Sequence, residues 1–418
     1  MDTSTCAVIL AIGDELTLGQ TVDTNSAWLS ARLIEQGILT AYHATVPDDL
    51  DAITRAVQDA ARAAPLVLIT CGLGPTEDDL TRDALAQAAD APLAMHQPSL
   101  ERLHQFFLSI NRPMPERNRV QALCPKGAEM LENDRGTAPG IRMSLARATV
   151  VAMPGVPHEM KAMYERHVAP RLTAQSGRVI LTEAVHTFGI GESQVAAQLG
   201  DLMQRGTNPQ VGTTVSAGIV TVRVRSEFAD RERAQFKLKE TLDLIGARLG
   251  DAVFGLGTMT LQEAVARLLR DRQKTVVTAE SCTGGLVAKL LTDVAGSSAY
   301  FRGGWVVYAN DLKERELQVP HELLATHGSV SEPVARALAE HAIRKGLADF
   351  ALAITGIAGP DGGTPEKPVG TVWIAVAENS GGGIAIRAVR RQFPGLRDLV
   401  RERAAKTALN DLRLAMVH

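Results

Sequence analysis

Strand-length apolar runs alternate with amphipathic segments of helical length along most of this chain. The run "CAVILAI" at 6–12 precedes a helical pattern over 25–36, and "PLVLIT" at 65–70 follows a second helical pattern over 48–63. This alternation is typical of βαβ units. It predicts an α/β fold with a mostly parallel sheet and helices on both faces.

The alternation stops in the middle of the chain and then resumes. Residues 178–250 read as strand, helix, strand, strand and long helix, which predicts a small α+β module. The stretch "GDAVFGLGTMT" after it is predicted to be a linker, and a new βα series begins at Leu261. Because 418 residues exceed the usual size of one core, we predict three domains, at 1–172, 173–254 and 255–418.

Composition narrows the class of protein. With 45% hydrophobic residues, 22% charged residues and a net charge of −3, the chain has no overall bias toward nucleic acid or anionic membranes. Its four cysteines lie far apart, which favours reduced thiols. No basic leader and no apolar run of about 18 residues is present. We therefore expect a cytoplasmic protein with no nucleic-acid or membrane partner.

Three unusual stretches in the N-terminal part follow predicted strands, where ligands collect in open α/β sheets. These are "AIGDELTLGQTVDTNS" at 11–26, "ITCGLGPTEDDLTRD" at 69–83 and "AMPGVPHEM" at 152–160. The first two crowd carboxylates that repel one another unless a cation lies among them. A divalent ion with a pyrophosphate is the simplest candidate, since hard oxygen ligands suit Mg²⁺-like ions. The alternative is that Asp14, Asp78 and Asp79 cap helices.

The C-terminal part carries a different set of reactive residues. Ser281 follows the predicted strand "TVVTAE" and precedes a glycine-marked turn into a helix, whose first N–H groups are a candidate oxyanion hole. A serine nucleophile needs a base, and no histidine falls in a motif of this half. Lys313, five residues after Tyr308, is the remaining candidate if burial lowers its pKa. The alternative for Ser281 is a helix N-cap.

Five ordered motifs, "GDELTLGQTVDTNS", "GLGPTEDDLTRD", "MPGVPHEM", "TAESCTGG" and "TGIAGPDGG", resemble those of the competence/damage-inducible protein A (CinA) family over nearly the whole chain. The resemblance implies an N-terminal molybdopterin-binding-like three-layer domain that hydrolyses ADP-ribose to AMP and ribose 5-phosphate. It implies a KH-like middle module. It also implies a C-terminal amidase that converts nicotinamide mononucleotide to nicotinate mononucleotide and ammonia.

The family's functional positions carry over to residues of this sequence. The implied catalytic residues of the amidase are Ser281 as nucleophile, Lys313 as its activating base, and Tyr308. The implied metal ligands of the N-terminal site, for an ion of the Mg, Mn or Co class, are Asp14, Glu15, Asp78, Asp79 and Asp83. The amidase is expected to need no cofactor, and a homodimer is expected. The implied substrate-binding residues are Thr283, Gly284, Thr355, Gly356, Gly359, Arg397 and Arg401 in the C-terminal part, and Gly13, Asn25, Gly72, Gly74, Pro75, Thr76, Gly155 and His158 in the N-terminal part.

Two other interpretations of function stay open at this point. In one, the amidase is retained and the N-terminal domain binds a pterin or nucleotide without turnover. In the other, the chain is a nucleic-acid-binding factor that acts through the KH-like module. The turn "GIGES" at 189–193 lacks the basic clamp expected for RNA, and only 4% of the residues are aromatic. These features disfavour nucleic acid.

Overall fold

The computed structural model describes residues 6–172 and 179–418, which form two compact units. One unit contains the chain up to Leu181 together with Ser226–Phe236, and the other contains Thr182–Arg225 together with Lys237–His418. Among the described residues, no helix is both long and apolar enough to cross a membrane.

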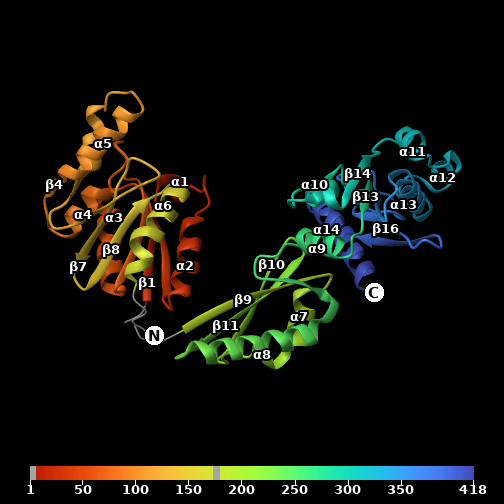
Figure 1. The fold of residues 1–418 in the computed structure, drawn as a ribbon, viewed down its shortest axis with the longest axis horizontal. Coiled ribbons are helices and arrows are strands. Elements are labelled where there is room, and N and C mark those ends of the chain that lie inside the picture. The colour runs from red at the N-terminus through yellow and green to blue at the C-terminus, as the bar shows by residue number, and fades with distance from the viewer. Residues whose placement is uncertain (1–5, 173–178) are drawn as a thin grey trace. The chain divides into compact units, whose positions relative to one another are not determined.

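The first unit is built on a six-stranded sheet flanked by helices (Figure 1). Its strands are β1 (Cys6–Ile12), β2 (Leu39–Val46), β3 (Leu66–Cys71), β6 (Glu129–Leu131), β7 (Gly140–Leu145) and β8 (Ala148–Pro154), with a separate pair β4 (Leu93–Met95) and β5 (Leu123–Pro125). Its α-helices are α1 (Asp14–Thr17), α2 (Asn25–Glu35), α3 (Leu50–Ala63), α4 (Thr81–Ala88), α5 (Gln97–Ser109) and α6 (Pro157–Met163), and a 3-10 helix spans Glu116–Ala122.

The sheet order is β2-β1-β3-β8-β7-β6. The strands β2, β1, β3 and β8 are parallel to one another, and β7 pairs antiparallel with both β8 and β6. Both faces of β1 are buried, because Val8 and Leu10 pack in one core cluster with α3 and α4, while Ala7 and Ile9 pack in another with α2 and α6. This burial explains why the central strands read as continuous apolar runs. The predicted mostly parallel sheet with helices on both faces is confirmed.

One predicted helix is wrong in its extent. From the sequence, the strand "ATVVAMP" at 148–154 is predicted to be followed by one helix from about His158 to Leu172. In the structure α6 ends at Met163 and gives way to a π-helical turn and then a 3-10 turn. Pro170 lies in the last of these turns and has no N–H to donate. A regular α-helix therefore cannot continue through it.

The middle module has the predicted element order and one further strand. It comprises β9 (Val179–Phe188), α7 (Glu192–Leu199), β10 (Gln210–Ser216), β11 (Ile219–Phe228), α8 (Arg231–Leu249) and β12 (Val253–Leu256), with 3-10 turns at Gly200–Met203 and Gly250–Ala252. The sheet order is β10-β11-β9-β12. The linker prediction is therefore wrong at β12, which pairs antiparallel with β9. A four-residue strand with an internal glycine has too little local pattern to be recognised without its partner.

The C-terminal part is a five-stranded sheet of order β14-β13-β15-β16-β17 with helices packed on it (Figure 1). Its elements are α9 (Leu261–Asp271), β13 (Val276–Glu280), α10 (Leu286–Thr292), a 3-10 turn (Ser297–Ala299), β14 (Phe301–Val306), α11 (Asn310–Leu317), α12 (His321–His327), α13 (Glu332–Gly346), β15 (Phe350–Gly356), β16 (Thr371–Asn379), β17 (Ile384–Gln392) and α14 (Arg397–Val417).

The strands β13, β14 and β15 are parallel, whereas β16 and β17 join as antiparallel neighbours. Leu352 and Ile354 of β15 pack with α9 and α14, and Ala351 and Ala353 pack with α13 on the other face. The carboxyl ends of three parallel strands therefore meet at one edge, where the candidate catalytic residues follow them.

Candidate active sites

A cavity of about 550 Å³ lies at the carboxyl ends of β1, β3 and β8 in the first unit. The predicted substrate-binding residues that line it are Gly13, Gly72, Gly74, Pro75 and Gly155. Glycine is required at Gly74, because a Cβ atom there would stand 2.6 Å from an oxygen of Asp79. The glycines therefore let the Asp79 carboxylate lie against the loop backbone.

Five carboxylates line this cavity, from Glu15, Asp48, Asp78, Asp79 and Glu159. Asp79 accepts a hydrogen bond from the backbone N–H of Thr76 at 2.8 Å, which folds the "GPTEDD" loop. Burial raises the pKa of Asp48, and the negative charges of Asp14, Glu15 and Asp78 raise it further, although a hydrogen bond from Asp14 opposes them. The cavity thus concentrates negative charge that a cation would neutralise.

Other predicted residues lie outside the cavity lining. Asp14 is tied to Asp48, since each accepts a hydrogen bond from the other's backbone N–H, at 2.9 and 3.1 Å. Asn25 donates to Thr70 and to the carbonyl of Gly155, so it holds two strand ends together. Thr76 shapes its loop through Asp79, whereas Asp83 and His158 are exposed at the starts of α4 and α6 and are not among the lining residues. The capping alternative fails for α4, whose N-cap is Leu80.

The donor set suits a cation that arrives with phosphate. Among residues 6–172 and 179–418, no three His, Cys, Asp or Glu side chains gather closely enough to hold a metal ion by themselves. Mg²⁺ usually binds through one or two carboxylates, several waters and the phosphates of its substrate, and does not need a complete protein cage. Glu15, Asp48 and Asp78 line the cavity, so one or two of them would be available as oxygen ligands for such a shared ion.

Sequence reasoning missed several residues of this cavity. Asp48 follows β2 directly, and the same strand-end rule that identified the other motifs would have found it. Gln121, Thr137 and Glu159 also line the cavity. Gln121 comes from the 3-10 helix Glu116–Ala122 and Thr137 from a loop, and neither segment has a periodic pattern. Glu159 belongs to the motif "AMPGVPHEM" but is not among the predicted metal ligands.

Ser281 lies directly after β13, between the ends of its two neighbouring strands. Its backbone N–H donates to the carbonyl of Ile354 in β15 at 2.9 Å, and the carbonyl of Glu280 accepts from Val307 at 2.8 Å. The chain then turns through Gly284 and Gly285, whose φ angles of 60° and 92° disfavour other residues. The N-cap of α10 is Gly285, so the alternative that Ser281 caps this helix is wrong.

The buried acid beside Ser281 caps α10 instead. Glu280 is fully buried, and its carboxylate accepts hydrogen bonds from the N–H groups of Gly285, Val287 and Ala288 at 3.0, 3.1 and 2.8 Å. The prediction that the first N–H groups of this helix form the oxyanion hole is therefore wrong, because Glu280 already uses them. In the described part of the chain, the N–H groups of Cys282 and Thr283 donate to no other residue and remain available.

Lys313 is the buried cation of this site. It lies in α11 with 1% of its surface exposed, and its amine donates to the carbonyl of Tyr308 at 3.0 Å. Burial lowers the pKa of Lys313, which the nearby Cys282 and Asp311 only partly offset. A lysine in such a place is neutral at a lower pH than a free lysine, so it can act as a base.

The thiol next to Ser281 is a poor nucleophile candidate. Burial raises the pKa of Cys282 to about 12, with Glu280 contributing and Arg401 and Arg397 opposing. A thiol with this pKa carries almost no thiolate near neutral pH. Ser281 is thus the better nucleophile candidate in this turn.

Two arginines of α14 connect the loops around Ser281. Arg397 donates to the carbonyl of Gly359 at 2.7 Å and to the phenol oxygen of Tyr308 at 2.9 Å. Arg401 donates to the carbonyls of Cys282 and Thr283 at 3.1 and 2.9 Å. Because a guanidinium has five N–H donors, both retain donors for a ligand.

The remaining predicted residues surround the same strand ends. Thr355 donates its hydroxyl to the carbonyl of Ser329 at 2.7 Å, and Gly356 ends β15. The Thr283 hydroxyl is buried and has no partner among the described residues. A Cβ atom on Gly284 would stand 3.5 Å from the Arg401 guanidinium. The structure thus brings loops from four segments to one edge of the sheet.

Fold and sites together define an α/β protein with two strand-end sites of opposite charge. Three family models match successive parts of the chain: a probable molybdopterin binding domain over 8–174, the damage-inducible protein CinA KH domain over 182–255, and the CinA C-terminal domain over 258–416. CinA-like proteins of Anaeromyxobacter sp. and Geobacter sulfurreducens are 44% and 43% identical, with 98% and 97% of this chain and 99% and 97% of theirs covered. The chain belongs to the CinA family.

Solved structures of the same family match part of the chain. A competence damage-inducible protein A from Klebsiella pneumoniae is 35% identical and covers 38% of this chain and 96% of its own, with a TM-score of 0.36. A competence/damage inducible protein from Agrobacterium tumefaciens is 40% identical and covers 38% of this chain and 98% of its own, with a TM-score of 0.35.

Proposed function

We propose that this protein hydrolyses nicotinamide mononucleotide to nicotinate mononucleotide and ammonia at the Ser281 site. The observation that carries the proposal is the burial of Lys313 in α11, where it interacts with Cys282, the neighbour of Ser281, and has a lowered pKa and an amine that donates to the neutral carbonyl of Tyr308. A serine and a neutral lysine together are a nucleophile and its base. No cofactor is needed for this chemistry.

The reaction follows from these groups. The neutral amine of Lys313 takes the hydroxyl proton of Ser281, and the resulting alkoxide attacks the carboxamide carbon of nicotinamide. The free N–H groups of Cys282 and Thr283 are the candidate donors to the tetrahedral oxyanion. The C–N bond breaks, the lysine ammonium returns the proton, and ammonia leaves.

The acyl-enzyme is then hydrolysed with the same base. The Lys313 amine takes a proton from water, the hydroxide attacks the acyl carbon, and the ester bond to Ser281 breaks. The proton returns to the serine oxygen, so the enzyme is regenerated and nicotinate mononucleotide is released. Arg397 and Arg401 have further donors for the substrate phosphate.

We also propose that the protein hydrolyses ADP-ribose to AMP and ribose 5-phosphate in the N-terminal cavity. Its support is the set of five carboxylates that line the cavity at the carboxyl ends of parallel strands. A divalent ion of the Mg, Mn or Co class, held by one or two of Glu15, Asp48 and Asp78 together with the substrate phosphates, would neutralise charge on the pyrophosphate. The glycines of the lining bring backbone close to the same phosphates.

One pair of assays tests both proposals. The purified full chain is incubated with nicotinamide mononucleotide and ammonia is measured, and in parallel it is incubated with ADP-ribose and AMP is measured. EDTA should abolish AMP release and leave ammonia release unchanged. Loss of ammonia release in EDTA would contradict the serine mechanism. Absence of AMP at every metal concentration would leave the N-terminal domain as a binder without turnover.

A further inference from the structure

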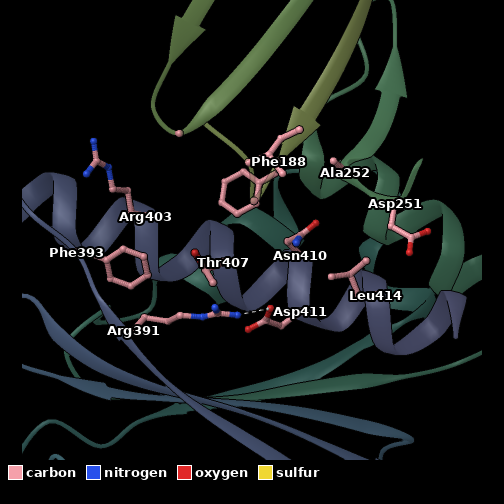
Figure 2. A pocket seen from close by; sticks show the side chains of 13 residues that line it. Phe188, Asp251, Ala252, Arg391, Phe393, Arg403, Thr407, Asn410, Asp411 and Leu414 are labelled. Atoms are coloured by element: carbon pink, nitrogen blue, oxygen red, sulfur yellow. Dashed lines mark hydrogen bonds and ion pairs between the residues drawn. The ribbon is translucent and has the colours of Figure 1, made fainter. Parts of the chain in front are cut away.

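A separate cavity of about 460 Å³ lies in the second unit, away from the Ser281 loop, between the end of β9 and the middle of α14 (Figure 2). Neither candidate active site uses its lining residues. Its size falls in the range of small-molecule sites, which are roughly 300–1,000 Å³. The aromatic, charged and hydrogen-bonding side chains of its lining include Phe188, Phe393, Arg403, Thr407, Asn410 and Asp411.

Two polar groups of α14, the hydroxyl of Thr407 and the Nδ2 atom of Asn410, face this cavity without a hydrogen-bond partner among the described residues. Asn410 is 5% exposed, and its Oδ1 atom accepts a hydrogen bond from Arg413 at 3.0 Å. Its Nδ2 atom lies 3.8 Å from where a Cβ atom on Gly189 would stand, and Gly189 lines the cavity. Within the described residues, neither Nδ2 of Asn410 nor the hydroxyl of Thr407 makes a hydrogen bond to the protein. The Nδ2 atom of Asn410 and the hydroxyl of Thr407 therefore keep hydrogen-bonding capacity for a ligand in the cavity.

The lining carries two arginines and two aspartates, and Arg403 is the arginine without an ion pair among the described residues. Asp251 contacts His418 at 2.8 Å. The Arg391 guanidinium is paired with Asp411 at 3.3 Å, so its charge is compensated. Arg403 donates to the carbonyl of Pro394 at 3.0 Å, and it forms no ion pair with any described residue. Arginine with unused donors is the side chain best suited to an anionic phosphate.

Two aromatic rings complete the lining. Phe188 comes from the end of β9 and Phe393 follows β17, and Figure 2 shows both rings bordering the space over α14. Flat apolar rings suit the faces of a heteroaromatic base. An aromatic surface, two hydrogen-bonding groups and an uncompensated arginine are the parts needed to hold a base that carries a phosphate.

We propose that this cavity is a binding site for a nucleoside monophosphate, distinct from both candidate active sites. The base lies against Phe188 and Phe393, Thr407 and Asn410 hydrogen-bond to base or ribose atoms, and Arg403 binds the phosphate. The proposal rests on this cavity alone and not on either proposed reaction.

Photolabelling of the full chain locates the site directly. The probe is 8-azidoadenosine 5′-monophosphate, and the labelled peptides are mapped by mass spectrometry after irradiation. We expect label in peptides from β9 or from 403–414, beyond Arg397 and Arg401 of the Ser281 site, and protection by AMP but much less by adenosine or inorganic phosphate. Label confined to peptides before residue 172, or equal protection by adenosine and AMP, would overturn the proposal.

Substitutions in the cavity lining test which side chains contact the bound nucleotide. Arg403→Gln and Thr407→Val each should reduce labelling of these peptides about tenfold at subsaturating probe, since each removes a hydrogen-bonding group from the ligand. Arg267→Gln is the matched control, because Arg267 is an exposed arginine of α9 that pairs with Asp271 and does not line the cavity. Thr407→Val keeps the side-chain shape, and circular dichroism checks that each variant is folded. Unchanged labelling in both cavity variants would contradict the assignment, whatever their ammonia release.

Discussion

The two candidate active sites occupy the same position in two different sheets, yet their chemistry is opposite. The N-terminal cavity gathers carboxylates at the ends of β1, β2 and β3, and most of these remain accessible to solvent and ions. The C-terminal site buries one amine, and one carboxylate of β13 that accepts its hydrogen bonds from the start of α10. From this difference we infer that the ends of parallel strands define where a site can form. The burial and the charge of the side chains at that position then determine which reaction the site can support.

The largest expected effect comes from mutation of Ser281 and Lys313, which should change the activity of one site and not of the other. Ser281→Ala and Lys313→Ala each should lower kcat for ammonia release by about a thousandfold, and the double variant should be little worse, because both groups act in one step. Lys289→Ala, which removes an exposed lysine of α10 paired with Asp293, is the control and should be near normal. ADP-ribose cleavage should be unchanged in all four variants. Near-normal turnover in Ser281→Ala would favour direct attack by water.

The next effect concerns the acidic cavity. Asp48→Asn and Asp78→Asn each should lower ADP-ribose cleavage about a hundredfold, since each removes a charged oxygen ligand facing the phosphates. Asp83→Asn makes the same chemical change at an exposed position outside the lining and should have little effect. AMP release is measured over a range of Mg²⁺ and Mn²⁺ concentrations. Equal losses in all three variants would argue against a cation held by the cavity.

A smaller effect is expected on stability from the buried cap of α10. Glu280→Gln should lower the free energy of unfolding by about 1–3 kcal/mol, because one acceptor oxygen and the charge that holds three N–H groups are lost. Glu263→Gln, at the exposed capping box of α9, should cost less than about 1 kcal/mol. Urea unfolding monitored by circular dichroism and by retained ammonia release measures both. A smaller cost for Glu280→Gln than for Glu263→Gln would show that Glu280 is not the main cap.

The smallest expected effect concerns how ammonia release and the free energy of unfolding depend on pH. Because burial lowers the pKa of Lys313, ammonia release should rise with pH through that lowered pKa and level off before about pH 10.4, where a free lysine deprotonates. Between the folded and unfolded pKa values the unfolded chain binds more protons, so the free energy of unfolding should rise with pH in that window. Lys313→Met should remove this dependence. A rate that rises only above about pH 10 would contradict the lysine base.

Local pattern is enough to predict much of the fold. The strands β1, β3, β13 and β15 are continuous apolar runs bounded by turn residues, and their alternation with amphipathic helices predicts parallel sheets. The strand-end rule then places Ser281 and the "GPTEDD" loop at candidate sites from the order of residues alone. These inferences succeed because they depend on periodicity and on the geometry of a single turn.

Contacts between distant segments are beyond local pattern. β12 exists only because β9 offers it a partner, and the roles of Glu280 and Arg401 depend on which backbone groups lie opposite their side chains. Asp48 and Asn410 became candidates because of their burial and their neighbours, which the spacing of residues along the chain does not reveal. The sequence by itself determined where strands end and which reactive side chains follow them. Only the tertiary structure decided which of those groups are desolvated, paired or left free, because desolvation and pairing depend on atoms brought together from far apart in the chain.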